Sequence, residues 1–246
     1  MYTVLTSIII QVMLMNQEVK RILVMRNDVV ERGFRNMDRF GADLFCLIIR
    51  ELRKNIEIVH RSECCFYYWE LKEYLSIDDH VSYEMYKKEI DRFKKTILSC
   101  WYEFENEATG VEMVVFTEVI NDKKNRMITV KANPDFLEFF LPSNRFTYLS
   151  LTEYCSLKTM YSKRLYAFLK QFRNTGYRRI SVEQFREYMG AEAKTYDDFA
   201  QLRRRVLLPA LNEITEKNYI KGLQFKEIKE NGSKKVTSLV FKFWVE

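Results

Sequence analysis

The clearest pattern of hydrophobic and polar positions lies in residues 194–214, where apolar side chains recur at the spacing of an α-helix. At about 100° per residue, the apolar positions fall within about 60° of Phe199, and they are Leu202, Val206, Ala210 and Ile214. The opposite side carries polar side chains, namely Asp197, Gln201, Arg204 and Arg205. The pattern predicts one long helix, with Thr195 as its N-cap and a kink or break just before Pro209.

The first half of the chain predicts a mixture of helices and strands. Helical spacing predicts helices over residues 41–54 and 82–99, and a brief one through Leu71 and Leu75. Asn133 as N-cap, followed by proline at the first helical position, predicts a short helix over residues 134–140. Alternating or aromatic-rich stretches predict strands, at residues 66–68, 101–104, 113–120 and 127–132. A polar turn at residues 121–125 joins the last two strands, which indicates a hairpin.

The second half predicts similar elements in a similar order. A helix over residues 161–172 is followed by a short strand and by a second helix, which Ser181 and Gln184 open as a capping box. The arginine-bearing helix is third. A hairpin then forms around Asn231–Gly232, a strong signal for a two-residue turn.

The two halves are therefore interpreted as an internal repeat. Glu73-Tyr74-Leu75 matches Glu187-Tyr188-Met189 at an offset of 114 residues. The repeated order is that of a winged helix-turn-helix module. We predict an α+β, helix-rich fold of two tandem winged helix-turn-helix domains, at residues 25–142 and 143–246. Residues 1–24 are expected to be an apolar N-terminal extension, ordered or not, whose strongly apolar stretch Tyr2–Met15 is too short to span a bilayer and lacks the pattern of a signal peptide.

Charge is distributed unevenly along the chain. Residues 1–160 hold 22 Lys and Arg against 24 Asp and Glu, whereas residues 161–246 hold 18 against 10, a net charge of +8. The positive potential is thus concentrated in the part that contains the arginine-bearing helix. This asymmetry favours a polyanionic partner, and nucleic acid before a membrane.

Motifs for catalysis are missing from the sequence. The five cysteines form no C-x-x-C pair and are interpreted as buried free thiols in a reducing cytoplasm, with a zinc site as the second interpretation. The two histidines are isolated, so neither a metal site nor the His pair of a nicking enzyme is predicted, and no phosphate-binding P-loop occurs. We expect no enzymatic activity, cofactor or metal.

Three segments together resemble the initiator replication proteins of iteron-controlled plasmids. They are residues 157–172, which begin Leu157-Lys158 and end at Phe172, then residues 199–214, and finally the stretch from Lys234-Lys235-Val236 through Phe243. The similarity extends from about residue 145 to the end and is weaker over residues 27–52. The motifs are specific only in combination.

This resemblance implies tandem winged-helix domains that bind direct repeats of double-stranded DNA at a plasmid origin in a bacterial cytoplasm. It implies that the second domain is the main reader of the repeat, and that the first assists and forms a homodimer interface. It further implies repression of the protein's own promoter by the dimer, and recruitment of host replication proteins, including the helicase and its loader. A repressor of the same fold without initiation activity is the alternative, and a nicking enzyme is a third interpretation.

Candidate DNA-contacting residues follow from the geometry of a winged helix. The arginine-bearing helix supplies Lys194, Tyr196, Asp197, Gln201, Arg204 and Arg205, and Arg203 is assigned either to DNA or to the fold. The wing supplies Lys234 and Lys235, and the first helix supplies Ser162, Lys163 and Arg164 as a phosphate site. The first domain offers Lys87 and Lys88, with Arg92, Lys94 and Lys95. For each group, a solvated charged surface is the alternative.

Overall fold

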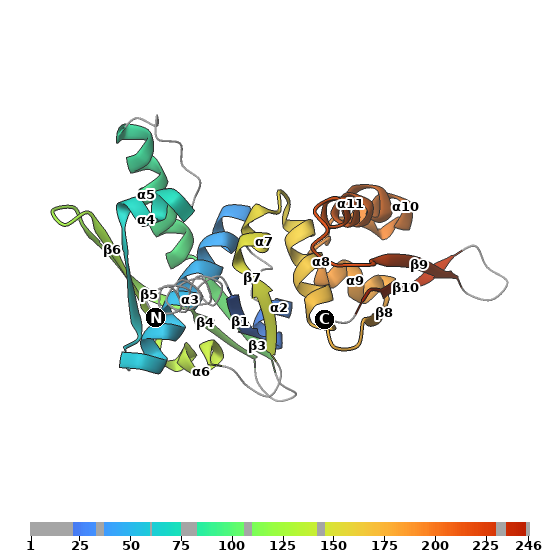
Figure 1. The fold of residues 1–246 in the computed structure, drawn as a ribbon, viewed down its shortest axis with the longest axis horizontal. Coiled ribbons are helices and arrows are strands. Elements are labelled where there is room, and N and C mark those ends of the chain that lie inside the picture. Colours follow the sequence, from blue (N-terminus) through green and yellow to red (C-terminus); the bar gives the residue numbers. More distant parts are fainter. Residues whose placement is uncertain are drawn as a thin grey trace, which may run out of the picture.

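Two modules lie side by side along the long axis of the molecule in the computed structural model (Figure 1). The structure describes residues 22–32, 37–59, 61–74, 83–105, 110–141, 146–229 and 235–244. Residues 1–21 of the predicted extension and the predicted boundary at 142–144 lie outside these ranges. The fold is the predicted one, two tandem winged helices.

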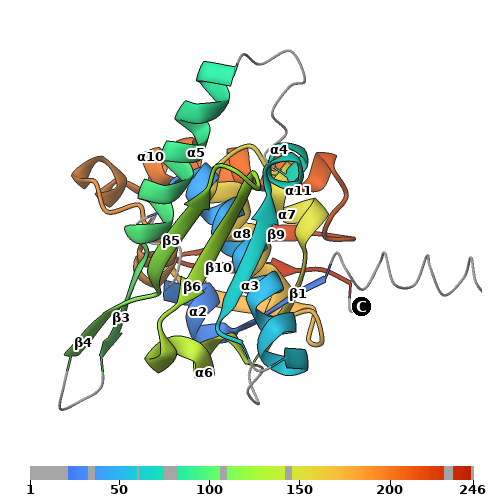
Figure 2. The same cartoon turned by 90° about the vertical axis from the view of Figure 1, so that its left-hand side faces the viewer.

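The first module has the predicted order of helix, strand, helix, long helix and hairpin. Its helices are α3 (Arg39–Val59), α4 (Tyr68–Tyr74) and α5 (Tyr83–Leu98). Its strands are β2 (Glu63–Tyr67), β5 (Phe116–Asp122) and β6 (Met127–Ala132), which form a sheet in the order β2-β6-β5. Figure 2 shows this sheet at the front with α3 behind it.

An additional hairpin separates α5 from the wing strands of the first module. It consists of β3 (Trp101–Glu105) and β4 (Gly110–Val114). The prediction of one strand over residues 113–120 is therefore wrong. Val115 and Phe116 are consecutive and both buried, which breaks the alternation that one strand requires. The chain changes sheet there: β4 pairs with β3, and β5 pairs with β6.

The second module repeats the arrangement. It contains α8 (Met160–Lys170), β8 (Tyr177–Ser181), α9 (Val182–Tyr188) and the wing strands β9 (Gln224–Lys229) and β10 (Val236–Lys242). The strand order β8-β10-β9 corresponds to β2-β6-β5 in the first module. The predicted cap of α9 is confirmed, because Ser181 Oγ accepts a hydrogen bond of 3.1 Å from the Gln184 N–H.

Between α9 and β9 the chain forms four successive helical pieces. They are the 3-10 turn η2 (Lys194–Asp197), α10 (Phe199–Leu202), the π turn η3 (Arg203–Leu207) and α11 (Leu208–Glu216). This composite helix, as we call residues 194–216, is third in its module. It takes the place that α5 has in the first module.

The segments that connect and flank the modules pack together. They are β1 (Ile22–Arg26), α2 (Asn27–Arg32), η1 (Pro134–Phe136), α6 (Leu137–Phe140), β7 (Phe146–Ser150) and α7 (Leu151–Ser156). β1 pairs antiparallel with β7, from Ile22 opposite Ser150 to Arg26 opposite Phe146. Strands on the two sides of the predicted boundary therefore belong to one ribbon. The predicted extension of residues 1–24 overlaps the start of β1.

A buried ion pair joins α3 of the first module to α8. Lys163 is fully buried, and its Nζ lies 2.6 Å from Asp43 Oδ1 and donates to the Tyr154 carbonyl at 2.6 Å. The ammonium also lies 4.7 Å from the centre of the Tyr154 ring. Burial raises the pKa of Asp43 although the Lys163 charge lowers it. The cost of desolvating the carboxylate thus exceeds the attraction of its partner.

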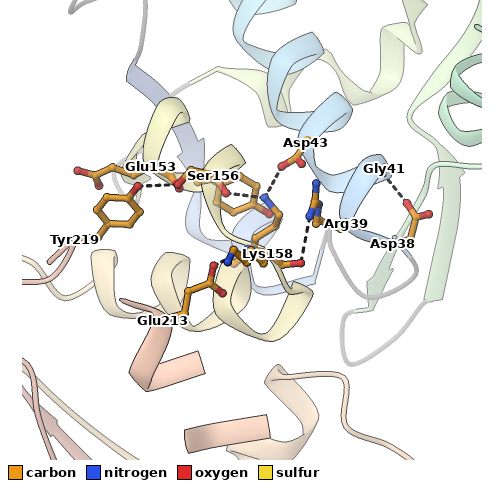
Figure 3. Close-up of polar contacts among 11 residues, drawn as sticks. Asp38, Arg39, Gly41, Asp43, Glu153, Ser156, Lys158, Glu213 and Tyr219 are labelled. Atoms are coloured by element: carbon orange, nitrogen blue, oxygen red, sulfur yellow. Dashed lines mark hydrogen bonds and ion pairs between the residues drawn. The ribbon is translucent and has the colours of Figure 1, made fainter. Parts of the chain in front are cut away.

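The short connection between α7 and α8 contacts both modules, as Figure 3 shows. On the side of the second module, the Lys158 N–H donates to Glu213 Oε1 on α11 at 2.7 Å, and the Ser156 and Tyr219 hydroxyls lie 2.7 Å apart. On the side of the first module, Arg39 on α3 donates to the Lys158 carbonyl at 3.5 Å. The ion pair of α8 with α3 and the packing of α8 against α11 therefore connect the two modules.

Candidate nucleic-acid interface

The composite helix begins differently from the prediction. Thr195 is not its N-cap, because residues 194–197 form a separate 3-10 turn. Asp198 caps α10 instead, since its Oδ1 accepts a hydrogen bond of 2.9 Å from the Ala200 N–H. Asp197 forms an ion pair with Arg186 of α9. This pair fastens the 3-10 turn to the preceding helix and gives Asp197 a partner within the protein.

A π turn, rather than a break, precedes Pro209, where a kink or break was predicted. The Leu208 N–H donates to the carbonyl of Arg203, five residues back instead of four. Pro209 lies in the first turn of α11, where a missing N–H is tolerated. The helix therefore continues past the proline, with its hydrogen-bond register shifted by one residue.

The three consecutive arginines of the π turn are all exposed but have different environments. Arg203 Nε lies 2.6 Å from Glu227 Oε1 on wing strand β9. Arg204 donates to Gln201 Oε1 on α10 at 2.9 Å. For Arg205, no hydrogen bond or ion pair is present within the described ranges. Arg204 and Arg205 are thus exposed guanidinium groups without a carboxylate partner in this part of the chain.

Two other predicted contacts of the composite helix, Lys194 and Tyr196, differ in exposure. The side chain of Lys194 is exposed. Tyr196 is half-buried and hydrogen-bonds with Tyr161 of α8, and burial together with this bond raises the pKa of Tyr161 to about 12. Tyr196 therefore contributes to packing between the 3-10 turn and α8, whereas Lys194 is available to a ligand.

The wing of the second module extends beyond its helices (Figure 1). Lys235 is exposed directly before β10, and Lys226 and Lys229 are exposed on β9. Lys234 lies outside the described residues. Positive side chains thus follow the wing toward the tip of the hairpin, as expected for contact with a phosphate backbone.

Ser162, Lys163 and Arg164, predicted as a phosphate site, are buried, with exposed fractions of 0, 0 and 6%. Thr159 caps α8, and its hydroxyl accepts a hydrogen bond of 3.0 Å from the Ser162 N–H. Lys163 is held by Asp43, and Arg164 donates to the Met189 carbonyl. We therefore correct the prediction and remove these three side chains from the candidate interface.

A left-handed glycine makes room for the buried Arg164. Gly190 has φ of +60°, and a Cβ at this position would lie only 1.8 Å from Arg164 Nη1. The turn after α9 thus requires glycine both for its backbone conformation and for the guanidinium packed against it.

On α5 of the first module, the five predicted cations fall into two groups. Arg92 forms an ion pair of 2.9 Å with Asp38 and lies 4.2 Å from the centre of the Phe40 ring. Lys94 lies 2.6 Å from Asp91 and lowers the pKa of that carboxyl. The remaining side chains are exposed, namely Lys87, Lys88 and Lys95.

Sequence reasoning missed a basic cluster at the wing of the first module. Lys123, Lys124 and Arg126 are exposed in the turn between β5 and β6. Asp122 organises this turn by accepting hydrogen bonds from the backbone and side chain of Asn125, at 3.0 and 2.7 Å. The signal was present in the sequence, because this turn occupies the place in the repeat that Lys234 and Lys235 occupy in the second module.

The described ranges contain no group of three or more His, Cys, Asp or Glu side chains placed to hold a metal ion. Within the same ranges, no helix is long and apolar enough to span a membrane.

Comparison with solved structures supports the tandem architecture. The chain is similar to the Pi initiator protein, crystallised in complex with iteron DNA, with a TM-score of 0.68 and 15% identity over 92% of this chain and 98% of that one. It is also similar to domains 2 and 3 of RctB, with a TM-score of 0.53 and 11% identity over 85% of this chain and 84% of that one. At these identities the similarity establishes the fold.

A curated relative and two family models provide the remaining comparisons. A probable replication protein rep of Bifidobacterium longum (strain NCC 2705) is 27% identical over 150 residues, which are 60% of this chain and 50% of that protein. The chain therefore spans about half the length of this relative. The family described as initiator replication protein, WH1, matches residues 22–170, and the one described as initiator Rep protein, WH2, matches residues 181–243. Since these matches together extend over both modules, the chain belongs to the family of initiator replication proteins.

Proposed function

We propose that the protein initiates plasmid replication by binding direct repeats of double-stranded DNA at the origin. The main support is the composite helix, which follows a capped helix and precedes a basic wing, and which exposes Arg204 and Arg205. A helix in this position inserts into the major groove of DNA. Membership of the initiator family and the +8 charge of residues 161–246 support the same assignment.

The two surfaces of the second module would have different tasks. Arg204 and Arg205 of the π turn are the proposed base contacts, because a guanidinium can donate to guanine O6 and N7 together. Lys194, Gln201 and Arg203 lie in the same helical segment and would support this contact. Lys235, with its neighbour Lys234, would bind the phosphate backbone from the wing, which positions the module without reading sequence.

The first module would assist through its own third helix and wing. Exposed lysines on α5 (Lys87 and Lys88) and in the β5–β6 turn (Lys123 and Lys124) support an auxiliary contact with the backbone. Because α8 connects the two modules, both would bind the DNA as one body.

The proposal includes a homodimer formed through the first module, with repression of the protein's own promoter. It also includes recruitment of the host helicase and its loader. Sedimentation velocity over a range of protein concentrations measures whether the homodimer forms.

Lys235→Ala should lower affinity by a similar factor for repeat and unrelated duplexes. Loss of one phosphate contact releases about one counterion fewer, so the slope of log affinity against log salt should decrease by about 0.9. A shift assay at several salt concentrations measures both quantities. Loss of affinity for the repeat alone would contradict the assignment of Lys235 to phosphate.

Strand opening distinguishes initiation from repression by the same fold. A supercoiled plasmid that carries the repeats and an adjacent AT-rich segment should become reactive to permanganate in that segment when the protein binds. The variant Arg204→Ala/Arg205→Ala is the matched negative control. Specific binding without opening would favour a repressor, and a metal-dependent nick at a defined position would favour the nicking enzyme.

A further inference from the structure

The apolar stripe of the composite helix changes phase in its middle. At about 100° per residue from Phe199, the buried positions before and within the turn, Leu202 and Val206, are centred near 320°. The buried positions after them, Leu207, Ala210, Leu211 and Ile214, are centred near 70° on the same wheel. All six are buried. On a continuous α-helix these six positions would spread over about 180°, so the centres of the two groups would point in different directions.

The π turn compensates for this difference. The two centres differ by about 110°, which is close to the rotation contributed by one residue of an α-helix. A π turn accommodates one residue more than an α turn, as the bond from the Leu208 N–H to the Arg203 carbonyl shows. Both halves of the stripe then face the core. The extra residue lies in a turn whose first three side chains are the exposed arginines.

We propose that this extra residue is a specificity-determining feature of the DNA-binding surface, because the wide turn sets the directions in which Arg204 and Arg205 project. The inference rests on the proposed function. The neighbouring contacts fit a fixed geometry: Arg203 is held by Glu227 of the wing, and Arg204 by Gln201 of the preceding turn. The surface that reads DNA is thus defined by the backbone of the turn as well as by the number of arginines.

Deletion of one residue from the turn separates the contribution of the turn's backbone from that of the arginine side chains. Deleting Arg204 shifts every later position by one residue, which places Leu202, Leu207, Leu211 and Ile214 on one stripe of an ordinary α-helix. Leu207 then takes the place of Val206 in the stripe, and Val206 moves to about 100° from the centre of the stripe. The matched control is Arg204→Ala, which loses the same side chain but keeps the length of the turn. A second pair consists of the deletion of Arg205 and its control Arg205→Ala, which again loses the side chain but keeps the length of the turn.

Both deletion variants should fold, with the circular dichroism of the parent protein and a cooperative thermal transition. Their affinity for the repeat duplex should fall at least about tenfold below that of the matching alanine variant, while affinity for unrelated DNA should change little between them. Equal affinity within each pair would overturn the role of the turn. Unfolding of both deletion variants would also overturn it, because the turn would then not be a one-residue insertion.

The same experiment distinguishes this inference from the proposed function. If Arg204→Ala and Arg205→Ala bind the repeat like the parent protein, the assignment of the DNA surface fails together with the inference. If the alanine variants lose specific binding and the deletions lose no more, only the role of the turn is overturned.

Discussion

Replacing both Arg204 and Arg205 by alanine should weaken binding to the direct repeat by about 1–3 kcal/mol for each bidentate base contact that is lost. The two guanidinium groups are exposed on the π turn, and their neighbours Val206 and Leu207 are buried in the core. The substitutions would therefore remove the proposed DNA contacts without creating a cavity. A shift assay with the repeat and with a scrambled duplex at one salt concentration measures the effect. The ratio of the affinity for the repeat to the affinity for the scrambled duplex should fall, because the affinity for the repeat decreases more.

A matched variant controls for the loss of two positive charges. Lys217→Ala/Lys221→Ala removes two cations near the C-terminal end of α11, away from the π turn. This variant should lower both affinities slightly and leave their ratio unchanged. If the arginine variant also lowered both affinities equally, the arginines would contact phosphates and another surface would read the sequence.

Lys163→Ala should lower the free energy of unfolding by about 3–5 kcal/mol, because it leaves the Asp43 carboxylate partly buried without its cation. The lysine bonds to Asp43 and to the Tyr154 carbonyl at 2.6 Å each and has no exposed surface. Urea unfolding followed by circular dichroism measures the change. A phosphate contact at the surface would instead predict almost no change in stability.

The double variant Asp43→Leu/Lys163→Met tests the cause of this loss. Because burial raises the pKa of Asp43 despite the adjacent ammonium, the ion pair gives little net stabilisation over an apolar pair. The double variant should therefore recover most of the stability that Lys163→Ala loses. Failure to recover it would show that the charges themselves hold α3 against α8.

The second module was largely predictable because its signals are local. Ser181 caps α9, Asn231–Gly232 indicated the hairpin between β9 and β10, and apolar residues at every third or fourth position indicated the arginine-bearing helix. Asp198 was not chosen as the cap because Thr195 also has a capping side chain, and the choice depends on the 3-10 turn and the Arg186–Asp197 pair. The apolar residues Leu207 and Leu211 already marked the change in direction of the stripe that the π turn compensates. A single stripe drawn through every fourth residue does not include these two positions.

Other features depend on contacts between residues distant in the sequence. Lys163 near the start of a helix is typical of a surface position, and its partner Asp43 is 120 residues away. Pairing of β1 with β7 likewise joins segments separated by the whole first module. The division of residues 113–120 at Val115 depends on which sheet each half joins. Pattern within a short window cannot supply this information, since it arises from tertiary packing.

Methylation interference on the repeat tests most directly whether the composite helix reads bases in the major groove. Methylation of particular guanines at N7, which faces the major groove, should block binding of the parent protein. Arg204→Ala/Arg205→Ala should bind the same methylated and unmethylated duplexes equally weakly. Interference that persists unchanged in the double variant, or its absence at every guanine for the parent protein, would contradict the assignment of base contacts to these arginines.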